Sequence, residues 1–405
     1  MKIKISDLVN EYGDGIHGTP NYDSNGDYYF INGNNLKDGS IVLDKETKKI
    51  SKEEFDKIKR PLNNNTVLVS INGTIGSVAF YDGEKYALGK SVCYLNAKDE
   101  KSKYLIKYLI STSTFLDYSL KVAHGSTIKN LAPSQVVDFE IDLGAASESE
   151  LYKIIDILKL FDEKMSNNNA ENNEYNSVIN ITYDKLFNVY NSKNIDKKFK
   201  YINEIEKNIP EDWNYMKISE IEKNIITGKT PSTSNANYFN GNIPFITIDD
   251  IRKNHFIYET NRSLSKCGAE SQKSKYLPKN SICVSCIATV GEVGITTTLS
   301  QTNQQINSIV LQNEYNLYYI YLTLIRYFSY SSGAKTGNIF ANMNKNDFES
   351  IKIVYPSFKI LEEFNYIVKP LFEKIKNNLQ ENITLNKIKK DIWSLYLNGK
   401  IRIED

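Results

Sequence analysis

Few residues in this chain have the types and spacing that chemistry requires. Cys283 and Cys286 have the CxxC spacing of a zinc-binding pair, and Cys267 and His255 lie upstream of them. However, apolar residues around the pair predict a strand, on which side chains three residues apart point to opposite faces. We therefore expect buried packing cysteines and no metal site.

Other catalytic patterns each lack a required residue. A phosphate-binding loop needs a glycine five residues before Gly-Lys-Ser/Thr, and the two candidates have Glu84 and Lys223 at that place. None of the nine prolines follows Asp, Asn or Pro, as the base-holding loop of an amino-methyltransferase requires. The nuclease-like Glu46-Thr47-Lys48 has no preceding Pro-Asp, and three histidines without a partner pattern do not support a nucleophilic triad. The sequence therefore predicts a protein without catalytic residues.

Composition limits the kinds of partner. The 405 residues include 50 Lys and Arg against 49 Asp and Glu, a formal net charge of +1, so a polyanion would have to meet local basic patches. No signal peptide or apolar run of membrane-spanning length is visible, and four cysteines do not make a disulfide framework. We expect a cytoplasmic protein that does not contact a membrane.

The elements that must position any functional residue occur twice. Thr19-Pro20 recurs as Thr230-Pro231, an offset of 230 − 19 = 211 residues, and segment 67–78 recurs as 282–293, an offset of 282 − 67 = 215 residues. This period is the length of a domain plus a helix and is too long for a solenoid unit. The chain is therefore expected to be a tandem duplication with pseudo-two-fold symmetry.

Each copy begins with a sheet-containing domain, residues 1–145 and 193–356. Short β-branched and aromatic runs between turn residues predict strands at 28–32, 67–71, 77–81, 92–95, 244–248, 281–287 and 307–311. Apolar residues at helical spacing predict helices at 103–121 and 316–330. The expected fold class is α/β, in the broad sense that includes α+β.

Segments 146–192 and 357–400 each predict a long helix with a coiled-coil seam. The seam residues are Leu158, Phe161, Met165, Asn168 and Asn172 in the first helix and Leu371, Ile375, Asn378 and Asn382 in the second. A buried Asn selects one register, so we expect the helices to form an antiparallel coiled coil. In the alternative, each helix packs only on its own domain. Pro370 should kink the second helix or mark a late start.

Three ordered motifs carry a resemblance to a known family. Small residues form a tight turn in 69–78 and again in 284–293, Gly125-Ser126-Thr127-Ile128 precedes a strand, and the first long helix contains Leu160-Phe161-Asp162-Glu163-Lys164. In order and spacing the motifs resemble the specificity (S) subunit of type I restriction–modification systems, over essentially the whole chain. The chain departs from the family at 143–147, which lacks the Pro-Pro before the helix, and at 333–339, where a second Gly-Ser-Thr-Ile would fall.

The resemblance implies two target recognition domains, each reading one half of a split sequence in double-stranded DNA. The helix pair would be a spacer, about 60 Å long for about forty residues, and the docking surface for two methyltransferase (M) subunits. In the family, S-adenosylmethionine binds to the M subunits, which methylate adenine N6, and the restriction (R) subunits cleave. The chain itself would bind no cofactor and would not be an enzyme.

Candidate DNA-facing residues are loop side chains that suit base edges or phosphates. They are His17, Thr19, Lys59, Arg60, Lys90, Ser126, Thr127 and Lys129 in the first domain, and Lys229, Thr230, Ser232, Thr233, Arg252, Lys253, Lys335 and Asn338 in the second. Gln304 and Gln305, beside Asn303, could read adenine or could equally cap a strand edge.

Two rival functions stay open. A coiled-coil scaffold whose domains bind proteins would show no salt-dependent affinity for DNA, whereas a DNA-specificity subunit would. The second rival is an enzyme with an unrecognised site, or a subunit of a combined restriction–methylation enzyme.

Overall fold

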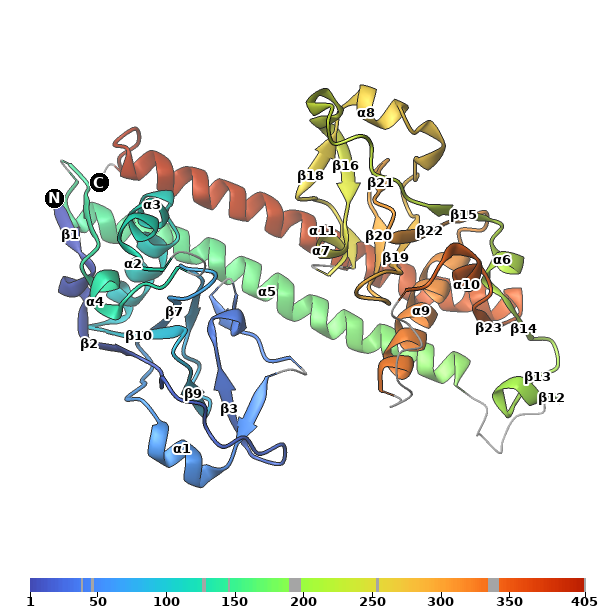
Figure 1. Cartoon of the computed structure of the whole chain (residues 1–405), viewed down its shortest axis with the longest axis horizontal. Coiled ribbons are helices and arrows are strands. Elements are labelled where there is room, and N and C mark those ends of the chain that lie inside the picture. The colour runs from blue at the N-terminus through green and yellow to red at the C-terminus, as the bar shows by residue number, and fades with distance from the viewer. Residues whose placement is uncertain are drawn as a thin grey trace. The chain divides into compact units, whose positions relative to one another are not determined.

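The computed structural model describes residues 1–37, 39–44, 47–125, 129–144, 146–188, 198–252, 255–333 and 342–403. The chain forms two compact units (Figure 1). Unit 1 comprises Met1–Ser166 and Ile383–Asp405, and unit 2 comprises Asn167–Asn382. The long helices α5 (Glu148–Phe187) and α11 (Phe358–Leu397) each contribute one half to each unit. Each unit therefore contains one α/β domain and a pair of helix halves.

The domain of unit 1 is built on a four-stranded antiparallel sheet and a three-stranded sheet. The first has the order β2 (Val9–Asp14), β10 (Val92–Ala97), β7 (Thr66–Ser70) and β8 (Val78–Phe80). In the second, β3 (Tyr28–Ile31) lies between antiparallel β6 (Lys48–Ile50) and parallel β9 (Tyr86–Leu88). The other elements are β1 (Lys2–Lys4) paired with β11 (Glu140–Asp142), β4 (Leu36–Lys37) paired with β5 (Ser40–Ile41), α1 (Lys52–Ile58), α2 (Glu100–Ile110), α3 (Ser113–Val122) and α4 (Pro133–Val137).

The domain of unit 2 has sheets of five and three strands. The first has the order β15 (Asn224–Thr227), β22 (Ile306–Val310), β19 (Ile282–Ser285), β20 (Val293–Thr296) and β17 (Phe256–Ile257). In the second, β16 (Phe239–Ile246) lies between antiparallel β18 (Arg262–Leu264) and parallel β21 (Gln301–Thr302). The other elements are β14 (Asn214–Lys217) paired with β23 (Lys352–Tyr355), β12 (Phe199–Ile202) paired with β13 (Lys207–Pro210), α6 (Ile218–Ile221), α7 (Ile248–Ile251), α8 (Lys266–Glu270), α9 (Asn316–Gly333) and α10 (Lys345–Glu349).

The two domains share one strand topology. The order β2-β10-β7-β8 recurs as β15-β22-β19-β20, and β6-β3-β9 recurs as β18-β16-β21 with the parallel pair in the same place. The pair β1–β11 recurs as β14–β23. The tandem duplication expected from the sequence is therefore confirmed, and unit 2 adds β17 to its larger sheet.

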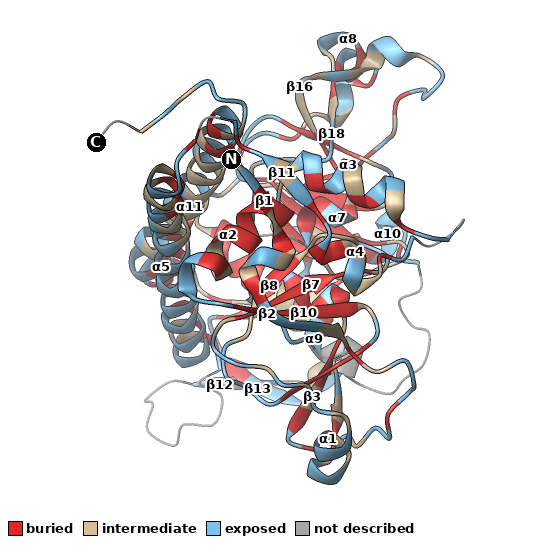
Figure 2. Cartoon of the chain, turned by 90° about the vertical axis from the view of Figure 1, so that its left-hand side faces the viewer, coloured by how far each residue is buried: buried red, intermediate tan, exposed pale blue. Residues whose placement is uncertain are grey.

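Each domain is joined to its helix halves by an apolar core. In unit 1, Leu105 and Leu109 of α2 are buried in one cluster with Leu151 and Leu158 of α5. Figure 2 shows α2 and the strands β7 and β10 as mostly buried. In unit 2, α9 packs in the same way, and its core includes Tyr183 of α5 and Phe364 of α11. The seam of each long helix is therefore apolar because it faces both a domain and the other helix.

One helix expected from the sequence is two helices in the structure. Every expected strand overlaps a strand of the structure, but segment 103–121 divides into α2 and α3. The break occurs because the Oγ1 of Thr112 accepts a hydrogen bond from the backbone N–H of Phe115 at 3.0 Å and caps a new helix. A threonine cap outweighs the continuous apolar spacing on either side of it.

Of the two outcomes expected at Pro370, a kink or a late start of the helix, the late start is wrong. Helix α11 begins at Phe358 and continues through Pro370. Proline removes one backbone donor inside a helix, while the neighbouring Val368 and Phe372 stay buried in the core of unit 2. Tertiary packing therefore maintains the helix across the proline.

In unit 2 the helix halves pair through a cluster of polar side chains that we call the asparagine node. Its members are Asn168, Glu171 and Asn172 of α5 and Asn378, Glu381 and Asn382 of α11. The Nδ2 of Asn168 donates to Glu381 at 2.7 Å and to the Oδ1 of Asn382 at 2.8 Å. The Nδ2 of Asn378 donates to Glu171 at 3.1 Å and to the Oδ1 of Asn172 at 3.0 Å. Since 378 − 168 = 210 and 382 − 172 = 210, each helix makes the same contacts to the other.

The node requires the antiparallel pairing that the sequence predicts, and this part of the fold is confirmed. Asn168 is fully buried and Asn172 is 6% exposed, so their amides depend on the opposite helix for partners. Among the other seam residues, Leu158 and Ile375 are buried, and Phe161, Met165 and Leu371 are half-buried. The alternative in which each helix packs only on its own domain is wrong.

In unit 1 an ion network joins the domain to both helix halves. The carboxylate of Asp162 on α5 contacts the Nζ of Lys107 at 2.7 Å and the Nζ of Lys389 at 2.6 Å, and it accepts a hydrogen bond from the Tyr108 hydroxyl at 2.7 Å. Burial opposes ionisation of Asp162, but the two ammonium groups outweigh it and hold its pKa below the ordinary value. The folded protein therefore favours the ionised form of the Asp162 carboxyl group.

Unit 2 replaces this network with aromatic packing. Phe372 lies 210 residues after Asp162 and is buried. Its ring stacks on Tyr318 of α9 at 4.1 Å between centroids, with an interplanar angle of 4°. The duplicated domains therefore dock on the helices through different chemistry at the same position.

We predict that Asp162→Asn destabilises the protein by about 3 kcal/mol at pH 7, since removing one partner leaves buried charges uncompensated. A lowered folded-state pKa gives stability that is present above the unfolded value of about 4 and is lost as pH falls through the folded value. The difference between wild type and variant should therefore shrink below about pH 4. Urea unfolding at several pH values measures it, with the exposed Asp156→Asn as control. Equal stability of the two variants would contradict the prediction.

Candidate functional site

A loop leaves the end of β2 in unit 1 and crosses the end of β9. The backbone N–H of Gly15 donates to the carbonyl of Val92 at 3.0 Å, and that of Ile16 donates to the carbonyl of Leu88 at 2.8 Å. These bonds hold segment 14–20 against the turn 89–92. We call these two segments loop pair 1.

Unit 2 contains the equivalent loop pair. The N–H of Gly228 donates to the carbonyl of Ile306 at 3.0 Å, and that of Lys229 donates to the carbonyl of Thr302 at 2.9 Å. Segment 227–233 thus lies against the turn 303–306, and we call them loop pair 2. Loop pair 1 has two more residues between its glycine and its Thr-Pro-containing end, since Gly15 precedes Pro20 whereas Gly228 precedes Pro231.

Both loops start with a glycine because no side chain fits there. A Cβ on Gly15 would lie 2.1 Å from the carbonyl oxygen of Leu88 and 2.3 Å from that of Gly89. A Cβ on Gly228 would lie 2.2 Å from the carbonyl oxygen of Asn303. The close backbone approach, which glycine alone permits, sets the position of each loop.

Loop pair 1 gathers basic side chains from three separate segments. His17 is exposed, and its Nε2 lies 2.7 Å from the carboxylate of Asp14. The Nε of Arg60 donates to the backbone carbonyl of Asp14 at 2.8 Å. Lys90 is exposed in the adjoining turn, and Thr19 is exposed in the loop itself. The structure therefore brings together four of the residues expected from the sequence.

Loop pair 2 is richer in neutral hydrogen-bonding groups. The hydroxyl of Thr230 donates to the Oε1 of Gln304 at 2.7 Å. The Nε2 of Gln272, which is buried, donates to the carbonyl of Lys229 at 2.7 Å and supports the loop from beneath. Lys229, Ser232 and Thr233 are exposed along the same segment. Gln272 was not expected from the sequence, because it lies 43 residues after Lys229, whose carbonyl it binds.

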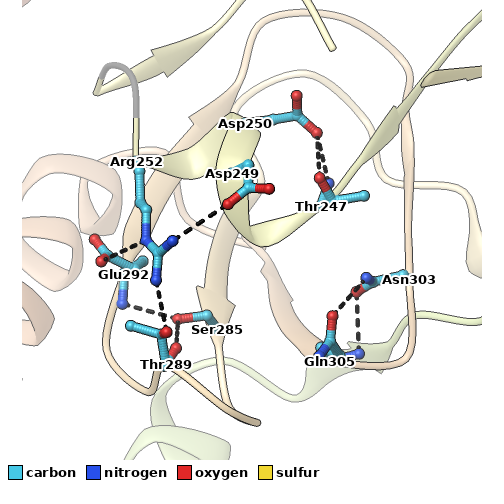
Figure 3. A network of polar contacts seen from close by, with 9 residues as sticks. All are labelled: Thr247, Asp249, Asp250, Arg252, Ser285, Thr289, Glu292, Asn303 and Gln305. Carbon is cyan, nitrogen blue, oxygen red and sulfur yellow. Dashed lines mark hydrogen bonds and ion pairs between the residues drawn. The ribbon is translucent and has the colours of Figure 1, made fainter. Parts of the chain in front are cut away.

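Other expected residues lie away from the loop pairs or outside the described residues. Lys59 pairs with Asp56 at 2.9 Å, and Lys129 is exposed beside Asn130, which bridges to Asn72 of the β7–β8 hairpin. Arg252 contacts Asp249, Thr289 and Glu292 at the β19–β20 hairpin (Figure 3). The expected residues that lie outside the described residues are Ser126, Thr127, Lys253, Lys335 and Asn338.

The two hairpins are duplicated down to their hydrogen bonds. The Ser285 hydroxyl donates to the carbonyl of Thr289 at 2.5 Å and accepts from the N–H of Glu292 at 2.9 Å (Figure 3). Ser70 makes the same two contacts in unit 1, with Thr74 and Ser77. These turns look alike in both units, in contrast to the loop pairs, whose side chains differ.

The CxxC pair is buried in unit 2, and His255 is half-buried there. Cys283 and Cys286 belong to two different apolar clusters, as expected for residues on opposite faces of a strand. Burial raises the pKa of the Cys283 thiol to about 12. Burial also lowers the pKa of His255, whose Nδ1 contacts the hydroxyl of Tyr321 beside a cavity of about 480 Å³. Within the described residues, no group of three or more His, Cys, Asp or Glu side chains could hold a metal ion.

Comparisons with known proteins place these features in a family. The family model described as type I restriction modification DNA specificity domain matches residues 1–177 and again 210–387. The chain is 39% identical over 198 residues to the HindI specificity subunit of Haemophilus influenzae, a match that spans 48% of this chain and 42% of that protein. It is 26% identical over 350 residues to the MjaIX specificity subunit of Methanocaldococcus jannaschii, covering 84% of this chain and 78% of that protein.

A solved structure shares the fold. The S subunit of a type I restriction–modification system from M. genitalium has a TM-score of 0.54 at 17% sequence identity, and the match covers 98% of this chain and 95% of that chain. In the part of the chain that the structure describes, no helix is both long enough and apolar enough to cross a membrane.

We predict that Gly15→Ala displaces loop pair 1 and destabilises the protein by about 1–3 kcal/mol, because the added methyl group overlaps two carbonyl oxygens. Gly18→Ala is the matched control three residues away, where a Cβ would meet nothing within 4 Å. Thermal unfolding of both variants measures the difference. Equal midpoints would show that the close approach at Gly15 does not hold the loop.

Proposed function

Because the chain belongs to the type I restriction–modification DNA specificity family, we propose that it is the specificity subunit of such a complex. Each loop pair reads one half of a bipartite target in double-stranded DNA. The observation that carries this proposal is the duplication of one backbone arrangement with different side chains. Loop pair 1 presents His17, Arg60 and Lys90, whereas loop pair 2 presents Thr230 and Gln304. Two equivalent backbones with such different side chains suit two different half-sites.

The helix pair would serve as the spacer and as the docking surface for two methyltransferase subunits. In unit 1, Ile157 of α5 and Ile388 of α11 are 37% and 42% exposed. In unit 2, Ile367 of α11 and Val178 of α5 are 39% and 47% exposed. Since 367 − 157 = 210 and 388 − 178 = 210, the same exposed aliphatic pair occurs once in each unit. A repeated apolar pair supports docking of two copies of one partner.

Under this proposal the chemistry belongs to the partners. Each methyltransferase subunit would bind S-adenosylmethionine and methylate adenine, and restriction subunits would cleave DNA in the full complex. This chain would supply sequence recognition and spacing, and would work in the cytoplasm, where its DNA targets are. A coiled-coil scaffold without DNA specificity is the alternative, and it predicts no target sequence.

We predict that the chain, expressed with the methyltransferase encoded beside its gene in a methylation-free host, produces one bipartite N6-methyladenine motif in long-read sequencing. The methyltransferase alone should produce none. Exchange of residues 1–145 with those of a relative should change only one half of the motif, because the two loop pairs belong to separate domains. A stable complex of the two proteins without a motif would favour the scaffold.

We predict that a heptad inserted after Ser166 together with a heptad inserted after Asn382 lengthens the gap between the half-sites by about three base pairs. Seven helical residues add about 10 Å, and B-DNA rises about 3.4 Å per base pair. These points face each other in the antiparallel register set by Asn168 and Asn382. Insertion into one helix alone is the control and should abolish methylation, because it breaks the seam. An unchanged gap in the double insertion would remove the spacer role.

A further inference from the structure

Lys90 and Gln304 occupy the same place in the two loop pairs. Each is the second residue of a turn closed by one backbone hydrogen bond, from Val92 to Gly89 at 3.0 Å in unit 1 and from Ile306 to Asn303 at 3.3 Å in unit 2. Both turns follow the strand that runs parallel to the centre of the three-stranded sheet. Both side chains are exposed. The duplicated scaffold therefore presents two different functional groups at one equivalent point.

The turn that carries Lys90 is held by its neighbours, while the lysine is not. The hydroxyl of Ser91 accepts from the N–H of Gly33 at 2.9 Å and donates to the Oδ1 of Asn32 at 3.1 Å. Among the described residues, the ammonium of Lys90 has no ion-pair or hydrogen-bond partner. A fixed turn with a free cation is suited to a ligand that offers acceptors only.

One contact orients the side chain of Gln304 and leaves half of its amide available, and a second contact holds the turn that carries it. The hydroxyl of Thr230 donates to its Oε1 at 2.7 Å. The turn beneath it is held by Asn303, whose Oδ1 accepts from the N–H of Gln305 at 3.1 Å (Figure 3). Since a carbonyl oxygen has two lone pairs, Oε1 can accept one more hydrogen bond while Nε2 donates. The amide therefore offers one acceptor and one donor side by side.

These groups match different bases in the major groove. Guanine presents two acceptors, N7 and O6, whereas adenine presents the acceptor N7 and the donor N6–H. A cation with donors only suits guanine, and it would face the N6–H donor of adenine unfavourably. A carboxamide pairs with adenine through both atoms, and the Thr230 contact holds its oxygen for that role.

We propose that Lys90 reads a guanine in the half-site bound by unit 1 and that Gln304, positioned by Thr230, reads an adenine in the half-site bound by unit 2. This assignment rests on the proposed function. It names two specificity-determining residues and the base that each takes. Because the backbones of the two turns are equivalent, exchanging the side chains should exchange the preferences.

The test maps methylation motifs for the full chain with its methyltransferase, comparing wild type with Lys90→Gln and Gln304→Lys. Lys90→Gln should replace one guanine by adenine in one half, and Gln304→Lys should alter one adenine in the other half. Methylation of the original motif should fall about ten- to a hundred-fold relative to the altered motif, the range expected for one bidentate base contact. Thr230→Val should relax the same position as Gln304→Lys. The controls are Lys52→Gln and Gln312→Lys, both exposed and outside the loop pairs.

The outcomes separate the inference from the function on which it rests. No bipartite motif with the wild-type chain would overturn the proposed function and the inference with it. A wild-type motif that Gln304→Lys leaves unchanged would overturn the inference alone. A uniform loss of methylation with an unchanged motif in Lys90→Gln would mean that Lys90 contacts phosphate, which also overturns its assignment.

Discussion

The asparagine node is the constraint on which the arrangement of this chain depends. Two of its four asparagines, Asn168 and Asn172, are buried, and a slip of either helix would remove their partners at a cost of about 1–3 kcal/mol for each unsatisfied group. The register that pairs Asn168 with Asn382 in unit 2 is the register in which Asp162 meets Lys389 in unit 1. Within unit 2, these hydrogen bonds determine which residues of α5 and α11 are available to the domain.

In the loop pairs, the contacts that fix the backbone are distinct from the side chains proposed to contact DNA. The loop pairs are positioned by main-chain hydrogen bonds and by glycines at which no side chain fits. Since these contacts do not involve the side chains of Lys90 or Gln304, those side chains can differ between copies without moving the turn. In the β7–β8 and β19–β20 hairpins, by contrast, the hydroxyl of a serine side chain holds the turn, and the serine is present in both copies. A duplicated specificity protein needs both kinds of element.

The sequence predicts what depends on repeated spacing and misses what depends on a single side-chain cap or on a distant contact. The helix pair was predicted because its seam repeats every three or four residues, and the tandem duplication was predicted because its landmarks recur. The division of segment 103–121 was missed because one capping side chain, Thr112, outweighs the apolar spacing. The hydrogen bond from Gln272 to the carbonyl of Lys229 was missed because no residue pattern links these two segments of the sequence.

The local sequence also indicated that two of the expected site residues have ion-pair partners of their own. Lys59 and Arg252 each have an aspartate three residues before them, and both pairs form in the structure. Such i, i+3 partners are visible in the sequence and lower the value of a cation as a ligand contact. Gly15 and Gly228, by contrast, mark the loops because each lies a few residues before a Thr-Pro, five residues before Pro20 and three before Pro231. Backbone requirements are thus easier to find in a duplicated sequence than side-chain roles.

The different docking of the two domains follows from the duplication itself. Two similar domains and two similar helices could in principle combine wrongly, with the first domain on the helix halves that belong to the second. At the position of Asp162 the second copy has Phe372, and at the position of Lys389 the first helix has Ile179, which is buried in unit 2. Wrong docking would set Lys107 against an aromatic ring and leave its charge uncompensated. A buried ion network adds little net stability over apolar packing, and Phe372 shows that the fold does not require one. Its physical effect is therefore on pairing, since it raises the energy of the alternative arrangement more than it lowers that of the native one.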